Sequence, residues 1–171
     1  MNLEKVSMGK NFPKEVNVFI EITQGSGVKY ELDKETHLLY VDRFVHVAMG
    51  YPFNYGFVPN TKADDGDPVD VMVISSSTVM PGAMIKVRPI GVLQMEDEAG
   101  MDNKVIAVPI VKIDPHYAEV NDIADIDAHT KKKIKHFFDT YKQLEEGKWV
   151  KTGDFLGKEA AEEEIAKGVI K

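Results

Sequence analysis

Four carboxylates crowd one short segment of this 171-residue chain. Residues 64–70 read, in order, Asp64, Asp65, Gly66, Asp67, Pro68, Val69 and Asp70, and an apolar run follows at once. Carboxylates this close repel one another unless solvent or a cation neutralises them. Oxygen ligands alone select hard cations such as Mg²⁺, Mn²⁺ or Ca²⁺. The segment therefore indicates either a divalent-cation site or a solvated acidic turn, because Asp, Gly and Pro also form turns.

A second acidic segment occupies residues 96–104 and contains Asp97, Glu98 and Asp102. It separates two expected strands, so we expect a hairpin loop with Asp97 and Asp102 facing each other at its base. Lys104 would then share a strand face with Asp102. The alternative is a polar hairpin tip without chemistry.

Cationic and phenolic side chains form a third group on separate elements: Lys29, Arg43, Lys104, Lys142, Tyr51, Tyr55 and Tyr141. Taken one at a time, each cation could simply occupy a solvent-facing strand position, and each tyrosine a position in the core, without any role in binding. Together with the carboxylates, they match the needs of a compact phosphate ester or anhydride. Divalent ions can hold the attacking and leaving oxygens, while Lys and Arg hold the outer phosphate oxygens.

Several other chemistries are excluded by composition. The chain has no cysteine, which removes disulfides, thiolate metal sites and cysteine nucleophiles. Its histidines show no HExxH spacing, and it has no GxSxG elbow. With 28 acidic residues against 21 Lys and Arg, the net charge is −7, which opposes binding to nucleic acid or to an anionic membrane.

Short strand-like runs fill the first two thirds of the chain, separated by loops with Gly and Pro. They are Val16–Ile22, Val28–Leu32, His37–Val45, Val69–Ile74, Met84–Met95 and Lys104–Val111. The last third changes period: we expect a short helix opened by Asp114 and Pro115, a longer one from Asp127 to Glu146, and a last one from Lys158 to about Lys167. This pattern predicts one β-rich domain, residues 1–171, with carboxy-terminal helices. Without a signal core or a run long enough to span a bilayer, we expect a cytoplasmic protein.

An ordered set of segments resembles the family I soluble inorganic pyrophosphatases of the short bacterial type, from about residue 15 to residue 150. The matching segments are Ile20–Ile22, Val28–Glu31, Val41–Phe44, Tyr51–Gly56, Asp65–Val71, Asp97–Gly100, Asp102–Lys104 and His136–Lys142. The resemblance implies an α+β, mainly β fold: a five-stranded, OB-like closed barrel with carboxy-terminal helices beside it. It also implies Mg²⁺-dependent hydrolysis of pyrophosphate to two phosphates, with Mn²⁺ as a substitute, in a homohexamer.

The resemblance assigns a role to each site residue. Asp65, Asp70 and Asp102 would hold the first metal, with Asp70 shared by the second; Asp97, Asp102 and Glu31 would hold the ions that arrive with substrate. Asp67 would be the general base for a metal-bridged water. The phosphate-binding set would be Lys29, Arg43, Tyr55, Lys104, Tyr141 and Lys142. Glu21 and Tyr51 would support these groups.

Three other functions remain open at this point. The first is a Mg²⁺-dependent phosphohydrolase acting on nucleotides or polyphosphate, because a fold does not fix the substrate. The second is a nucleic-acid-binding OB module, which the net charge opposes. The third is a non-catalytic structural protein that binds divalent cations.

Overall fold

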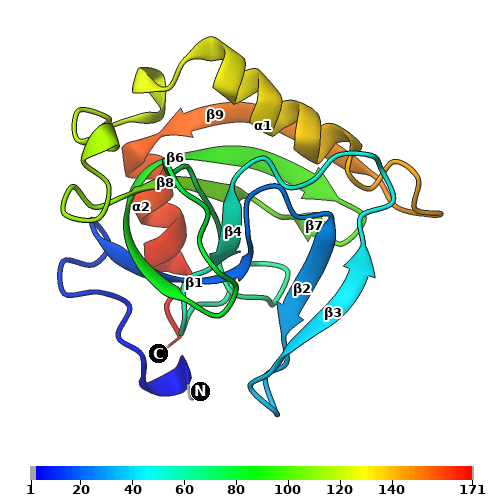
Figure 1. Cartoon of the computed structure of the whole chain (residues 1–171), viewed down its shortest axis with the longest axis horizontal. Helices are drawn as coiled ribbons and strands as arrows, with labels where there is room; N and C mark the ends of the chain where they lie inside the picture. Colours follow the sequence, from blue (N-terminus) through cyan, green and yellow to red (C-terminus); the bar gives the residue numbers. More distant parts are fainter. Residues whose placement is uncertain (1–2, 171) are drawn as a thin grey trace.

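The computed structural model describes residues 3–170, and most of its regular structure is β (Figure 1). The larger sheet contains β1 (Val16–Ile22), β4 (Asn54–Phe57), β5 (Asp70–Val73), β6 (Met84–Asp97), β7 (Gly100–Met101), β8 (Lys104–Pro109) and β9 (Val150–Gly157). A separate antiparallel hairpin consists of β2 (Val28–Leu32) and β3 (Leu39–Phe44). The helices are α1 (Ala128–Thr140) and α2 (Lys158–Lys167), with short 3-10 helices at Leu3–Lys5, Pro115–Tyr117 and Ile123–Asp125.

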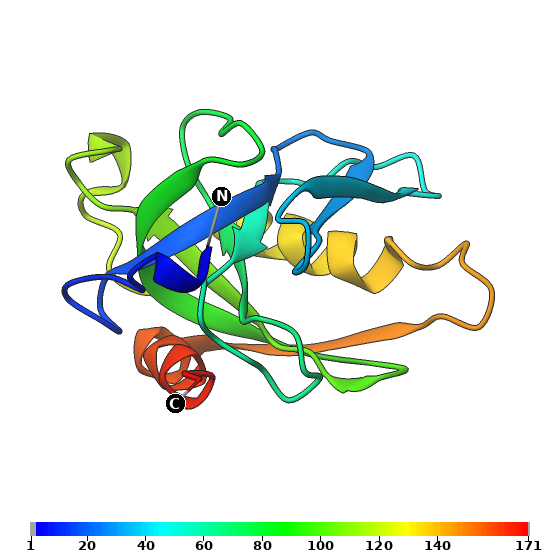
Figure 2. The same ribbon diagram turned by 90° about the horizontal axis from the view of Figure 1, so that it is seen from below.

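The strands of the larger sheet follow the order β1-β4-β5-β8-β6-β7, with β9 also paired to β6. The β1 strand pairs with β6 as well as with β4, so it is hydrogen-bonded along both edges. All of these pairs are antiparallel except β5 with β8. In Figures 1 and 2 the β2–β3 hairpin projects to one side of this sheet.

One glycine allows β1 and β4 to approach closely. Gly56 lies opposite Ile20 in the register, and a Cβ at this position would lie 1.8 Å from the carbonyl oxygen of Phe19. Any larger residue would therefore push the two strands apart, because backbone atoms cannot give way as a side chain can.

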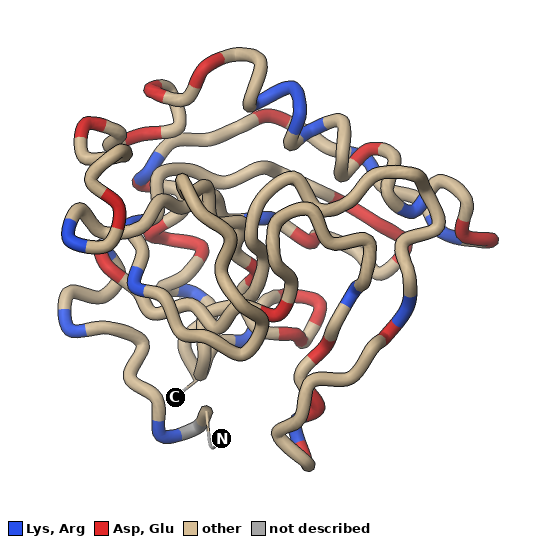
Figure 3. Tube along the Cα trace, viewed as in Figure 1, with Lys and Arg blue, Asp and Glu red and all other residues tan. Residues whose placement is uncertain are grey.

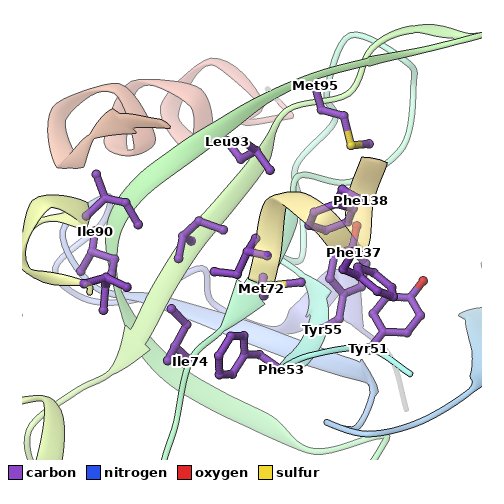
Figure 4. Close-up of a cluster of buried hydrophobic side chains, with 14 of the residues drawn as sticks. Tyr51, Phe53, Tyr55, Met72, Ile74, Ile90, Leu93, Met95, Phe137 and Phe138 are labelled. Carbon is purple, nitrogen blue, oxygen red and sulfur yellow. The ribbon is translucent and has the colours of Figure 1, made fainter. Parts of the chain in front are cut away.

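An aromatic cluster holds α1 against the sheet (Figure 4). The helix buries Ile134, Phe137 and Phe138, which recur at the spacing of one helical face. The ring of Phe137 lies 4.8 Å from that of Tyr51, measured between centroids. Because Tyr51 lies three residues before the start of β4, this packing fixes the end of α1 relative to that strand.

The structure confirms a mainly β chain with helices beside the sheet, and it corrects some of the expected elements. Three strands were not expected, β4, β7 and β9, and α1 ends at Thr140 rather than at Glu146. Beyond Tyr141 the chain forms turns and then joins the sheet as β9, paired with β6. In these turns Glu145 binds Arg43, a distant partner that the helical periodicity of the sequence does not indicate. No helix in the described part of the chain is long and apolar enough to cross a membrane.

Candidate active site

Every site residue expected from the sequence lines a single cleft of about 1120 Å³. These residues are Glu21, Lys29, Glu31, Arg43, Tyr51, Tyr55, Asp65, Asp67, Asp70, Asp97, Asp102, Lys104, Tyr141 and Lys142. They come from β1, the β2–β3 hairpin, β4 and the residues before it, the start of β5 and the segment before it, the β6–β8 region, and the residues that follow α1. Figure 3 shows basic and acidic positions interleaved along the β2–β3 hairpin, which contributes to this cleft.

The acidic loop, residues 64–70, is a tight turn that carries Asp65, Asp67 and Asp70 to the cleft. The Ala63 amide donates to the Asp67 carbonyl (2.6 Å), and the Gly66 amide donates to the Ala63 carbonyl (3.0 Å). Gly66 has a φ of +94°, a conformation that favours glycine. The Asp67 amide donates to Oδ1 of Asp65 (3.0 Å), while the Asp67 side chain is 72% exposed. The loop is therefore both a turn and part of the cleft.

Lys104 lies at the inner end of the cleft, between two carboxylates. The lysine is 2% exposed, and its Nζ donates to Asp70 Oδ2 (2.6 Å) and to Asp102. The hydroxyl of Tyr55 also donates to Asp70 Oδ2, at 2.6 Å. Burial alone would lower the pKa of Lys104, but the charges of Asp70 and Asp102 outweigh it and raise that pKa. The lysine therefore stays charged although it is buried.

Burial is the largest influence on the ionisation of Asp102. Burial raises the pKa of Asp102 to about 6, and the nearby charges of Asp70 and Asp65 add to this effect against the opposing charge of Lys104. Asp102 and its neighbours therefore form a place where further positive charge would be stabilising.

The other cations of the cleft are held by carboxylates on its walls. Lys142 Nζ donates to Asp97 Oδ2 (2.6 Å), and this bond helps to lower the pKa of Asp97 against the opposing effect of burial. Lys29 donates to Glu31 and to Asp42 (3.1 Å). These pairs keep the ammonium groups directed at the cleft.

Glu21 and the tyrosines lie deeper than these cations. An oxygen of Glu21 accepts the Leu32 amide (2.7 Å), which ties β1 to β2. Burial raises the pKa of Glu21 to about 8, against the opposing effect of the Leu32 hydrogen bond. Burial also raises the pKa values of Tyr51, Tyr55 and Tyr141 well above the usual value. At neutral pH these phenols are therefore neutral hydrogen-bonding groups.

Several charged side chains that pair with residues of the cleft were not expected from the sequence. Arg43 Nε donates to Glu145 Oε1 (3.0 Å), and Lys148 Nζ donates to Glu98 Oε1 (2.5 Å). Lys34 Nζ lies 3.2 Å from Asp67 Oδ1. The Glu145 pair joins residues 102 positions apart, so no local pattern could have indicated it.

The expected pairing at the base of the second acidic segment was wrong in one respect. Asp97 lies opposite Gly100 in the register, not opposite Asp102, because the β7 turn is tighter than expected. Asp102 instead donates its amide to the Met95 carbonyl (2.9 Å). The expected proximity of Asp102 and Lys104 is confirmed by their hydrogen bond.

The donor chemistry of the cleft suits hard divalent cations. Among residues 3–170, no three acidic or histidine side chains converge closely enough to form a ready-made cation site. Asp70 and Asp65 nevertheless lie near enough to Asp102 to add to the effect of burial, which raises its pKa, and Lys104 links Asp70 with Asp102. Oxygen donors with excess negative charge fit Mg²⁺ or Mn²⁺ in preference to softer metals.

Comparisons with known proteins agree over nearly the whole chain. Residues 18–171 match the family model described as inorganic pyrophosphatase. The chain is 53% identical, over 169 residues, to the inorganic pyrophosphatase of Aquifex pyrophilus; this covers 99% of the chain and 96% of that protein. The solved inorganic pyrophosphatase from Thermus thermophilus superposes with a TM-score of 0.95 at 42% identity, covering 99% of this chain and 97% of that one. The Helicobacter pylori structure gives a TM-score of 0.93 at 51% identity, covering 96% of each chain.

Proposed function

Since the chain belongs to the inorganic pyrophosphatase family and hydrolyses pyrophosphate, we propose that the cleft described above is its active site. One observation carries this proposal. Carboxylates, lysines, an arginine and tyrosines from separate parts of the chain all line the same cleft. A substrate with charge on many oxygens needs this combination of groups.

The carboxylates of the cleft would hold Mg²⁺, with Mn²⁺ as a substitute. Asp65, Asp70 and Asp102 would hold one ion, and Asp70 would be shared with a second. Asp97, Asp102 and Glu31 would hold the ions that accompany the substrate. When bound, such ions neutralise the carboxylates, attract the phosphate oxygens and lower the pKa of a coordinated water.

Asp67 is the proposed general base. Its side chain is exposed at the edge of the acidic loop, and its backbone is fixed by the bonds to Ala63 and Asp65. It would accept a proton as water attacks one phosphorus and the bond to the bridging oxygen breaks, which releases the second phosphate. A positioned base of this kind contributes typically about 10²–10⁴ in rate.

The cations and phenols would bind the phosphate groups. Arg43 can form two parallel bonds to phosphate oxygens, whereas Lys29 and Lys142 act as point charges. Lys104, Tyr55 and Tyr141 complete the set. Their carboxylate partners hold these groups in place until the substrate competes for them.

We also propose three features of the whole chain. The pairing of β1 with both β4 and β6 supports a five-stranded, OB-like barrel. The match of the family model to residues 18–171 supports a single domain. A homohexamer is proposed on family grounds, and the cytoplasmic location stays a prediction.

Phosphate release from pyrophosphate, measured with Mg²⁺ and with excess EDTA, tests the proposed chemistry. We expect rapid release with Mg²⁺ and none with EDTA, while ATP under the same conditions is a poor substrate. Equal rates with and without the chelator would refute the role of divalent cations. Faster release from ATP than from pyrophosphate would favour the nucleotide phosphohydrolase alternative.

A further inference from the structure

The side chain of Thr61 joins the two ends of the segment that contains the acidic loop. Its hydroxyl donates to the Val58 carbonyl (2.6 Å) and accepts the Val69 amide (2.9 Å). The Val58 amide also donates to the Val69 carbonyl (3.0 Å). Thr61 is only 3% exposed, so this hydroxyl is shielded from competing water. Val69 lies between Asp67 and Asp70, the proposed base and a proposed metal ligand.

The last described residues of the chain pair with the same segment from the other side. The Lys62 amide donates to the Gly168 carbonyl (2.6 Å), and the Ile170 amide donates to the Asn60 carbonyl (3.2 Å). Between these two bonds, Thr61 and Val169 form an antiparallel bridge. Residues 168–170, which follow α2, therefore lie as a short strand along residues 60–62.

The contact between these segments is too close for any residue but glycine at position 168. A Cβ on Gly168 would lie 2.6 Å from Cγ2 of Val69. The φ of Gly168 is −71°, which any residue can adopt, so the backbone conformation does not require glycine there. Glycine is required at this position because the backbone packs closely against Val69.

We propose that Thr61 and residues 168–170 are positioning parts of the active site, which hold the acidic loop in its working position. The inference rests on the proposed roles of Asp65, Asp67 and Asp70. Asp65 and Asp67 of the loop line the open cleft, while the buried Thr61 hydroxyl and the Gly168 contact hold the base of the loop at Val69. A displacement of about 1 Å at reacting groups can cost about 10²-fold in rate, so this support bears directly on turnover.

Substitution of Thr61 tests whether its hydroxyl positions the acidic loop for catalysis or only stabilises the fold. Thr61→Val keeps the shape but removes the hydroxyl, and we expect kcat to fall about tenfold to a hundredfold with a smaller change in KM. Thr61→Ser should restore kcat. The control is Thr152→Val, which removes a threonine hydroxyl that donates to Asp139 Oδ1 (2.6 Å) away from the cleft. Thr152→Val should lose about as much unfolding free energy as Thr61→Val, but its kcat should stay unchanged.

A second pair of variants covers the case in which Thr61→Val does not fold. Gly168→Ala should displace the tail from Val69, whereas Gly27→Ala, which meets nothing within 4 Å, is its matched control. In all folded variants, amide hydrogen exchange of residues 62–70 is measured in EDTA. We expect faster exchange in Thr61→Val and Gly168→Ala than in the controls.

The outcomes distinguish this inference from the proposed function. Thr61→Val and Gly168→Ala with unchanged kcat and unchanged exchange would overturn the positioning role. So would an equal loss of kcat in Thr152→Val, or no recovery in Thr61→Ser. Asp67→Asn is assayed in parallel: if it retains full activity, the proposed role of the acidic loop fails, whatever the Thr61 variants do.

Discussion

At the scale of single residues, the cleft is built from charges that hold one another in place. Lys104 is buried between Asp70 and Asp102, and Lys142 is paired with Asp97. In water such pairs are worth little, but in a buried site the loss of one partner leaves an uncompensated charge. The same residues that would bind phosphate therefore also stabilise the empty site.

Removal of the Lys104 charge tests this dual role. We expect Lys104→Met to lose about 3–5 kcal/mol of unfolding free energy in EDTA, because two carboxylates lose their buried partner. Added Mg²⁺ should restore part of the loss. The measurement is urea denaturation with and without Mg²⁺.

The control for this variant is Lys158→Met, which removes a partly exposed lysine 3.8 Å from Glu162. The unfolding free energy of Lys158→Met should fall by less than about 1 kcal/mol. Equal losses in the two variants would show that Lys104 has no special electrostatic role.

Glu145 offers a second test at this scale, because it binds Arg43 at 3.0 Å. In Glu145→Gln the arginine loses one of its two charged partners and keeps Asp42, so we expect KM for pyrophosphate to rise roughly threefold to tenfold while kcat changes less. Glu146→Gln, an exposed neighbour, is the control. Steady-state kinetics that are the same for both variants would remove Glu145 from the account.

At the scale of elements, local signals predicted most strands and helix starts but not the elements fixed by distant partners. Asp114 and Pro115 begin a short helix as expected, and the alternation in 28–32 marks β2. The β9 strand forms because β6 offers it a free edge, and β4 forms because Gly56 allows contact with β1. The partners of β4 and β9 lie far away in the sequence, so these pairings cannot be read from the residues of either strand alone.

Asp114, which caps the short helix at Pro115–Tyr117, leads to a prediction of how stability depends on pH. Burial opposes its ionisation, but hydrogen bonds from the Ser76 amide and hydroxyl and from the His116 amide outweigh this effect and lower its pKa. A lowered pKa stabilises the fold above the unfolded value of about 3.8, and this contribution disappears as the pH falls through the folded pKa. Asp114→Asn should therefore lower the unfolding free energy by about 1 kcal/mol at pH 7, because hydrogen bonds to a charged acceptor are stronger than those to a neutral one.

The difference between Asp114→Asn and the parent chain should narrow as the pH falls below 4. Denaturant midpoints measured at several pH values provide the test. A difference that is constant with pH would mean that the charge of Asp114 contributes nothing. Asp127→Asn, at the start of α1, has the same cap chemistry without the Ser76 contacts, and so serves as a comparison.

At the scale of the whole molecule, an acidic protein handles an anionic substrate. The net charge of −7 repels pyrophosphate at long range, so attraction must be local. The fold supplies it by bringing the β2–β3 hairpin, the acidic loop and the segment after α1 to one cleft. The residue types suggested a phosphate site, and the resemblance of the ordered segments to a known family predicted which side chains would meet there.

What the sequence could not indicate at this scale is how the site is supported. The pairs of Arg43 with Glu145 and of residues 60–62 with residues 168–170 join distant parts of the chain. Such pairs depend on the folded arrangement and leave no periodic pattern. They are the contacts that turn a set of suitable residues into a fixed site.

The most direct test of the central claim compares two neighbouring aspartates of the acidic loop. Asp67 lines the cleft, whereas Asp64 does not. Phosphate release from pyrophosphate under saturating Mg²⁺ is measured for Asp67→Asn and Asp64→Asn, with unfolding midpoints as a check on folding. The account predicts a loss of about 10²–10⁴ in kcat for Asp67→Asn and near-parent turnover for Asp64→Asn. Near-parent turnover in a folded Asp67→Asn protein would contradict it.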